Sequence, residues 1–270
     1  SDIYPDRIGS ALGVTMATGD LGQTVLPPIA GALAATIAWQ LGLAFIAPLL
    51  LVVGVVLWVV LPAQTPTASA VDSLSVESAR YVVAELRRSN LLFVAFILFL
   101  YILIWQSFTG FYPTYLVEVK GLPSSLAGVL FSVFFAFGVV VKPLAGAAYD
   151  RIGMRRSLVA VLVGPVAGLA VLPFTESLWA LVAVTALVST MLGSGAITQS
   201  FLSDAIPDEI QGTGLGAVRT TSATLGAAGP VLFGAIADRG YFDEGYLLLA
   251  AILVVVVLLT LRLPESDRRR

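Results

Sequence analysis

Three charged side chains interrupt long apolar runs of this sequence, and their surroundings limit the chemistry that they could do. They are Asp20, Lys142 and Arg219. A charge near the centre of a membrane-spanning helix costs about 2.5 to 3.5 kcal/mol, so each of them needs a partner or water. Asp20 could carry a proton, or it could belong to an ion pair that either breaks during function or is purely structural.

Several other chemistries are excluded by what the sequence lacks. It contains no cysteine and no histidine, which excludes disulfides, thiolate metal sites and an imidazole proton relay. An intramembrane aspartyl protease would need two carboxylates at one depth. Asp20 is expected roughly 16 Å into its helix, near the middle of a bilayer, whereas Asp150 is expected at the edge. We therefore expect no enzyme activity, no metal and no cofactor.

Polar and aromatic side chains recur at helical spacing on two segments. The first stripe contains Tyr101, Trp105, Thr109 and Tyr112, with Gln106 beside it, and the second contains Thr190, Ser194 and Thr198, with Gln199 nearby. Such stripes face something other than lipid. They either line a solute pathway or contact neighbouring helices, with which Ser and Thr form hydrogen bonds.

A tight charged turn, Gly146 to Arg156, joins two apolar runs. Asp150 can accept hydrogen bonds from the free amides at the start of a helix, and Gly153 permits a sharp reversal of the chain. The cations of the turn could pair with Asp150 or with lipid phosphate, or could simply mark the cytoplasmic side. These cations are Arg151, Arg155 and Arg156.

Composition indicates that a membrane-embedded helical protein positions these groups. Apolar residues make up 58% of the chain and charged residues only 12%, more apolar surface than one water-soluble core could hide. The predicted fold class is therefore an all-α membrane protein. Windows of about twenty residues predict eight membrane helices, over residues 9–37, 40–62, 91–117, 124–149, 157–174, 178–202, 211–237 and 245–263.

The arginines indicate how these helices are oriented. If the first helix starts in the cytoplasm, most arginines lie at cytoplasmic ends, and only Lys120 and Arg239 lie outside. Both ends of the chain are then cytoplasmic. We expect a multi-pass protein of the cell membrane.

The sequence also contains an internal repeat that is six helices long. An offset of 203 residues aligns the first predicted helix with the seventh, pairing Gly13 with Gly216, Pro27 with Pro230 and Gly31 with Gly234. Each copy follows a polar turn that contains proline and then runs outward. The copies are therefore parallel repeats, related by an axis along the membrane normal.

The charged turn resembles the Gly-x-x-x-Asp-Arg-x-Gly-x-Arg-Arg signature of the major facilitator superfamily, which follows the second and eighth helices of its twelve-helix transporters. If it is the eighth-helix copy, the first four helices of the family are absent. This implies a truncated chain or, as an alternative, a natural eight-helix protein. Residues 1–62 would be the last two helices of the N-terminal half, 63–90 a cytoplasmic linker with an amphipathic helix, and 91–270 the six-helix C-terminal half.

A second motif resembles the glycine-proline motif in the fifth helix of the superfamily's antiporters. Its residues in the two repeats are Gly13, Gly22, Pro27 and Gly31, and Gly216, Gly229, Pro230 and Gly234. Small residues allow close helix packing, and proline bends a membrane helix. Leu26 stands where the family has glycine. The resemblance favours export over import, while ordinary packing glycines remain an alternative.

The resemblance also implies roles for the charged and polar groups. The family's fifth and eighth helices pack together, which implies an Asp20–Lys142 pair and a cytoplasmic gate in which Asp150 reaches the helix start near Gly9 and Ser10. The gate would include Arg151, Gly153, Arg155 and Arg156. The implied substrate cavity contains Tyr101, Trp105, Gln106, Thr109, Thr190, Ser194, Thr198 and Arg219.

These features predict a secondary active transporter that moves a small organic solute by alternating access, as a proton-coupled exporter of a drug or metabolite. The alternatives are an importer of the same fold and a non-transporting membrane sensor or scaffold. Expected partners are membrane lipid and the solute, and not nucleic acid. We expect the full-length protein to be monomeric.

Overall fold

The structure is a computed structural model that describes residues 7–37, 40, 44–60, 91–206 and 211–263. Within these residues the chain is helical and contains no β-strand, which confirms the all-α prediction. The helices are α1 (Ile8–Thr36), α3 (Ile46–Val60), α5 (Leu91–Glu118), α6 (Ser124–Val171), α7 (Leu178–Ser189), α8 (Gly193–Ala205), α9 (Gln211–Gly226), α10 (Ala228–Ala237) and α11 (Phe242–Leu261), with 3-10 turns η2 (Leu172–Phe174) and η3 (Thr190–Leu192).

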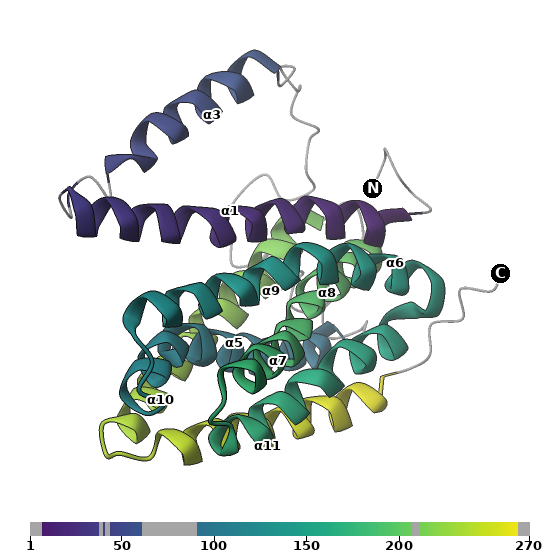
Figure 1. The fold of residues 1–270 in the computed structure, drawn as a ribbon. Helices are drawn as coiled ribbons and strands as arrows, with labels where there is room; N and C mark the ends of the chain where they lie inside the picture. Colours follow the sequence, from purple (N-terminus) through teal and green to yellow (C-terminus); the bar gives the residue numbers. More distant parts are fainter. Residues whose placement is uncertain (1–6, 38–39, 41–43, 61–90, 207–210, 264–270) are drawn as a thin grey trace.

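The helices from α5 to α11 form one bundle, and α1 lies along its side (Figure 1). The helix α3 stands apart from the bundle in this view and has no buried residue. The predicted linker, residues 63–90, lies outside the described residues. The division of the chain into 1–62, 63–90 and 91–270 therefore stays a prediction.

Five helical stretches of the described chain are long and apolar enough to cross a membrane, rather than the eight predicted. They are Leu91–Glu118, Ser124–Phe174, Leu178–Ala205, Gln211–Ala237 and Phe242–Leu261. The difference has physical causes. The helix α3 has 15 residues, fewer than the roughly twenty that a span needs, and α1 contains many glycine and polar residues. One stretch, Ser124–Phe174, contains two of the predicted helices.

The long helix α6 is two antiparallel legs joined at Gly153. An unbroken helix over Ser124–Phe174 would be roughly 75 Å long, far more than one bilayer. Gly153 instead has φ 76° and ψ 174°, a conformation that residues with a side chain rarely adopt. The chain doubles back at this residue, as Figure 1 shows for α6.

The first leg of α6 packs closely against α1 in the antiparallel direction. Gly9 lies against Gly146, Gly13 lies against the backbone of Lys142 and Pro143, and Asp20 lies against Gly138. A methyl group on Gly13 would come within 2.5 Å of the Lys142 carbonyl oxygen. Small residues in membrane helices permit this close backbone approach. The close contact brings polar groups of the two helices within bonding distance.

Aromatic rings join α5 to α6, α10 and α11 at the centre of the bundle. Phe108 lies 5.1 Å from Phe134, and Tyr246 lies 4.6 Å from Tyr115 and 5.0 Å from Phe233, between ring centroids. Such tilted and edge-on pairs contribute about 0.5 to 1.5 kcal/mol each beyond burial. This cluster fixes α5, which carries the first polar stripe, relative to the rest of the bundle.

We predict that Gly146→Ala destabilises the protein by about 1 to 3 kcal/mol, because its Cβ would fall on the backbone of Gly9, which cannot move aside easily. Gly128→Ala in the same helix is the control, since a Cβ there meets nothing within 4 Å. Thermal unfolding in detergent measures both variants. Equal midpoints for the two variants would contradict close packing of α1 on α6.

Candidate functional site

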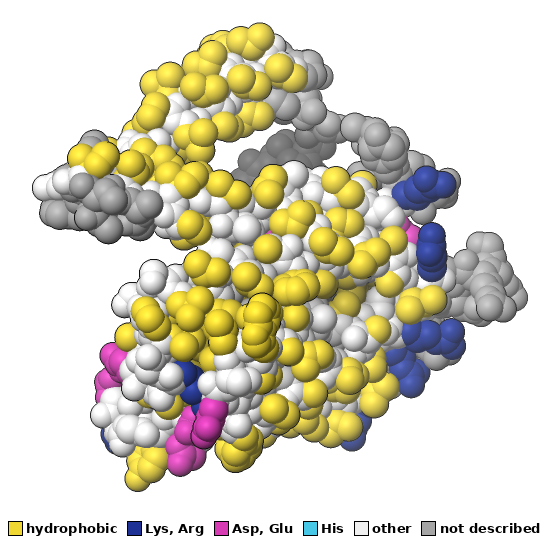
Figure 2. Space-filling model, viewed as in Figure 1, with side chains coloured by type: hydrophobic (Ala, Val, Ile, Leu, Met, Phe, Trp, Pro, Cys, Tyr) yellow, Lys and Arg dark blue, Asp and Glu magenta, His cyan; other side chains and the backbone are white. Residues whose placement is uncertain are grey.

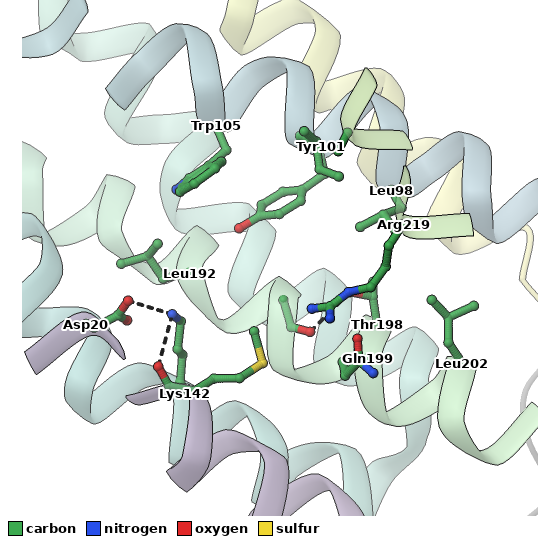
Figure 3. Close-up of a pocket in the computed structure, with 14 residues that line it drawn as sticks. Asp20, Leu98, Tyr101, Trp105, Lys142, Leu192, Thr198, Gln199, Leu202 and Arg219 are labelled. Carbon is green, nitrogen blue, oxygen red and sulfur yellow. Dashed lines mark hydrogen bonds and ion pairs between the residues drawn. The ribbon is translucent and has the colours of Figure 1, made fainter. Parts of the chain in front are cut away.

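A buried ion pair links α1 to the first leg of α6. Lys142 Nζ lies 2.6 Å from Asp20 Oδ1, and it also lies 3.5 Å from the Met16 carbonyl oxygen (Figure 3). Asp20 is 4% exposed and Lys142 is 9% exposed. A charge buried to this degree without its partner is strongly unfavourable, so the two side chains depend on each other.

A glycine makes room for the carboxylate of this pair. A Cβ at Gly138 would overlap Asp20 Oδ2, and it would also come within 2.6 Å of Leu192. Oδ2 lies in the space beside this glycine and has no hydrogen-bond partner among the described residues. Sequence reasoning missed Gly138. The one available signal was its position four residues before Lys142, one helical turn away on the same face.

The ion pair forms part of the wall of a cavity of about 300 Å³. Residues from α1, α5, α6, α8, α9 and η3 line this cavity (Figure 3). Of the residues that the sequence singled out, it contains Asp20, Lys142, Tyr101, Trp105, Thr198, Gln199 and Arg219. Charged, aromatic and hydroxyl groups from five helices therefore face one space.

Four residues of the predicted substrate cavity lie elsewhere: Gln106, Thr109, Thr190 and Ser194 do not line it. Thr109 donates a hydrogen bond to the Trp105 carbonyl 2.8 Å away, and Thr190 donates one to the Val161 carbonyl of α6 at 2.9 Å. Ser194 is buried. Thr190 lies in η3, which winds more tightly than an α-helix, so it loses its register with Ser194 and Thr198 of α8.

Apolar side chains complete the cavity, and sequence reasoning missed them because they look like any other residue of a membrane helix. They are Met16, Leu98, Ile102, Leu192, Leu202 and Ala223. Tyr112, which belongs to the first stripe, is instead buried in the bundle and shares a 2.5 Å hydrogen bond with Thr185.

Asp150 bridges the charged turn of α6 to the start of α1. Its carboxylate accepts hydrogen bonds from the backbone amides of Gly9 at 2.9 Å and Ser10 at 2.8 Å, and from the Ser10 hydroxyl at 2.6 Å. The first amides of a helix have no partner within the helix, and the helix dipole favours a negative charge there. Tyr149, beside Asp150, donates a 2.7 Å hydrogen bond to Asp204 at the end of α8.

The three arginines of the turn differ in exposure. Arg151 and Arg156 are exposed, and Arg155 is half-buried. Figure 2 shows that lysine and arginine gather at the end of the molecule where α6 reverses, and that acidic side chains gather at the opposite end. The acidic residues of the opposite turns are Glu118, Glu176, Asp238, Asp243 and Glu244.

Some glycines of the glycine-proline motif lie in close helix contacts, and others face open space. Gly13, Gly229 and Gly234 lie in close contacts, and a Cβ on Gly229 would come within 2.5 Å of the Leu103 carbonyl oxygen of α5. In contrast, a Cβ on Gly216 would meet nothing within 4 Å, and one on Gly22 would meet only Leu26 at 3.9 Å. Pro27 lines a groove with Gly22, Pro230 is half-buried, and the surroundings of Gly31 lie outside the described residues.

Long apolar helices around a cavity that contains charged side chains indicate a multi-pass membrane protein. Residues 1–230 match the sequence model of the Major Facilitator Superfamily, and the chain belongs to this family. It is 24% identical to a hexuronate transporter of Bacillus subtilis (strain 168), over 96% of the chain and 65% of that protein. It is 25% identical to the multidrug resistance protein MdtG of Proteus mirabilis (strain HI4320), over 50% of the chain and 33% of that protein.

We predict that Lys142→Met destabilises the protein by about 3 to 5 kcal/mol, because it leaves a buried carboxylate without its partner. The double variant Asp20→Leu, Lys142→Met should recover most of that loss, since two apolar side chains need no compensation. Thermal unfolding in detergent compares the two variants with the unmodified protein. A double variant as unstable as the single one would show that the two side chains do not act as a pair.

Proposed function

We propose that the protein is a secondary active transporter that exports a small organic solute by alternating access and is coupled to protons. The observation that carries this proposal is the buried Asp20–Lys142 pair in the wall of a largely apolar cavity. Membership of the Major Facilitator Superfamily supports transport, and the similarity to a multidrug resistance protein supports export. The chain spans 65% of the hexuronate transporter, so the activity proposed is that of the whole protein.

We propose eight membrane spans with both ends of the chain in the cytoplasm and the protein in the plasma membrane. The α6 legs on either side of Gly153 count as two spans, and α1, with 29 residues, is roughly 43 Å long. The eighth is the predicted span 40–62, of which α3 is the described helical part. Arginine is concentrated at the end where α6 reverses, which supports a cytoplasmic position for that end. In this proposal the protein contacts lipid over most of its surface, binds no nucleic acid and is a monomer.

In this mechanism the contact between α1 and α6 is the moving interface. Asp150 holds the start of α1 when the cytoplasmic side is closed, and it releases Gly9 and Ser10 when that side opens. The arginines of the turn, Arg151, Arg155 and Arg156, adjust the charge around Asp150. Gly153 keeps the turn short. The glycines of α1 and α6 permit a close contact that can be made and broken without side chains interlocking.

Asp20 is the proton acceptor of this mechanism. When a proton binds to its carboxylate, the negative charge disappears and Lys142 loses its partner. The cationic Lys142 is then free to bind an anionic group, and the link between α1 and α6 weakens. Release of the proton restores the pair. Apart from the O–H bond of this protonation, no covalent bond forms or breaks, and the mechanism needs no cofactor.

A second candidate is an importer of a metabolite on the same fold. The hexuronate transporter supports it, because that protein aligns with 96% of the chain. The two candidates differ only in the direction in which the proton gradient drives the solute. Proteoliposomes of known protein orientation distinguish them, since an exporter accumulates solute in inside-out vesicles and an importer accumulates it in right-side-out vesicles.

We predict that a pH gradient drives accumulation of an organic solute by proteoliposomes, and that Asp20→Asn abolishes this accumulation while solute exchange without a gradient continues. The reason is that an amide cannot take up the proton. Uptake of radiolabelled indole-3-acetate, tryptamine and glucuronate measures both activities. Asp150→Asn, which keeps Asp20, is the control and should retain coupling.

Equal loss of accumulation and exchange in Asp20→Asn would contradict the proton role and leave Asp20 as a structural residue. Failure of any gradient to move any of the three solutes would contradict transport itself.

A further inference from the structure

The cavity carries one positive charge that nothing in the described chain neutralises. Asp20 and Lys142 neutralise each other at 2.6 Å. Arg219, from α9, lines the same cavity and is exposed, and it forms no ion pair or hydrogen bond within the described part of the chain. An unpaired guanidinium is a preferred partner for a carboxylate, which it can bind through two parallel hydrogen bonds.

Apart from Asp20 Oδ2, which lies against Gly138, and the Gln199 amide, which can both donate and accept, the unused hydrogen-bonding groups of the cavity are donors. Trp105 Nε1 is buried and has no partner among the described residues, and an indole N–H can only donate. Lys142 has three donors, of which Asp20 takes one and the Met16 carbonyl a second, weaker one. Figure 3 shows the Lys142 ammonium, the Arg219 guanidinium and the Tyr101 hydroxyl facing the same space. A ligand that satisfies these groups must supply acceptors.

Apart from Gln199, the rest of the lining is apolar or aromatic and offers few partners to a ligand rich in hydroxyls. Leu98, Ile102, Leu192 and Leu202 offer no hydrogen bond, and the Thr198 hydroxyl already donates to the Ser194 carbonyl at 2.7 Å. Each ligand hydroxyl buried here without a partner would cost about 1 to 3 kcal/mol. The cavity therefore fits one charged group attached to an apolar body, and a sugar acid fits it poorly.

We propose that the cavity binds a small amphipathic organic anion, with its carboxylate on Arg219 and its apolar or aromatic body between Tyr101, Trp105 and the leucines. The volume of about 300 Å³ is at the lower end of ligand pockets, which limits the anion to a small one. This inference names the substrate class of the transporter proposed above and rests on that proposal. It differs from the solute named for the Bacillus subtilis relative, because a hexuronate carries several hydroxyl groups.

The test is a binding measurement on the purified chain in detergent, by isothermal titration calorimetry with four probes. Indole-3-acetate is the amphipathic anion, indole-3-acetamide and tryptamine are its neutral and cationic counterparts, and glucuronate is the hydroxylated anion. We expect indole-3-acetate to bind at least about tenfold more tightly than each of the others, because one hydrogen-bonded pair of charged groups contributes a difference in affinity of this size. Arg219→Gln should abolish this preference.

Two further variants keep the result interpretable. Arg219→Lys retains the charge and should retain the preference for the anion over the amide. Arg239→Gln makes the same charge change in the turn after α10, where the guanidinium donates to the Ala235 carbonyl outside the cavity, and it should change nothing. The comparison of the four probes on the unmodified protein stands even if Arg219→Gln fails to fold.

If tryptamine or indole-3-acetamide binds more tightly than indole-3-acetate, the proposal that the ligand is an anion is wrong. If glucuronate binds more tightly than indole-3-acetate, the proposal that the ligand has an apolar body is wrong. An anion preference that survives Arg219→Gln would overturn the role of Arg219. Binding needs no gradient, so it separates the two proposals. Anion binding without transport contradicts only the proposed function, and transport of a cation contradicts only this inference.

Discussion

The contact between α1 and α6 depends on one buried ion pair, Asp20 with Lys142. Removing two charges from water is expensive, and only a short, well-placed contact repays that cost. The close packing of the two helices supplies this geometry. Gly138 leaves space for the carboxylate, and Gly13 lets the backbones approach beside Lys142. A Cβ at either glycine would come too close to Asp20 or to the Lys142 backbone, so both glycines favour the 2.6 Å contact.

Asp150 forms a second link between α1 and α6, at the charged turn of α6. Because α1 and α6 are antiparallel, the charged turn of α6 meets the first turn of α1, where free amides are available. Both links are electrostatic, and the backbone packing between them involves glycines rather than interlocked side chains. Such an interface can separate and close again when one charge changes, which a large apolar interface does less readily. This property suits a transporter whose halves must alternate between two positions.

Most of the helical architecture could be predicted from the sequence, because long apolar runs have few alternatives in a membrane. The reversal at Gly153 follows from a glycine inside a charged turn. The number of membrane spans was harder to predict, since α3 is short and α1 is polar.

For the site, Asp20, Lys142 and Arg219 stood out because charge is rare in such runs. Tyr101, Trp105 and Thr198 were recognised by spacing, which failed for Thr190, where η3 changes the helical winding, and for the buried Ser194. Gly138 and the apolar lining depend on how helices approach, which no single segment encodes.

The opening of the α1–α6 contact can be measured directly by the distance between two spin labels. The chain has no native cysteine, so cysteines introduced at Val14 in α1 and Leu144 in α6, both exposed, give one labelled pair. Pulsed electron spin resonance in lipid nanodiscs reports the distribution of their separation. A moving interface predicts two populations whose ratio shifts when the pH is lowered and in the variant Asp150→Asn. A single separation that stays the same at every pH and in that variant would contradict it.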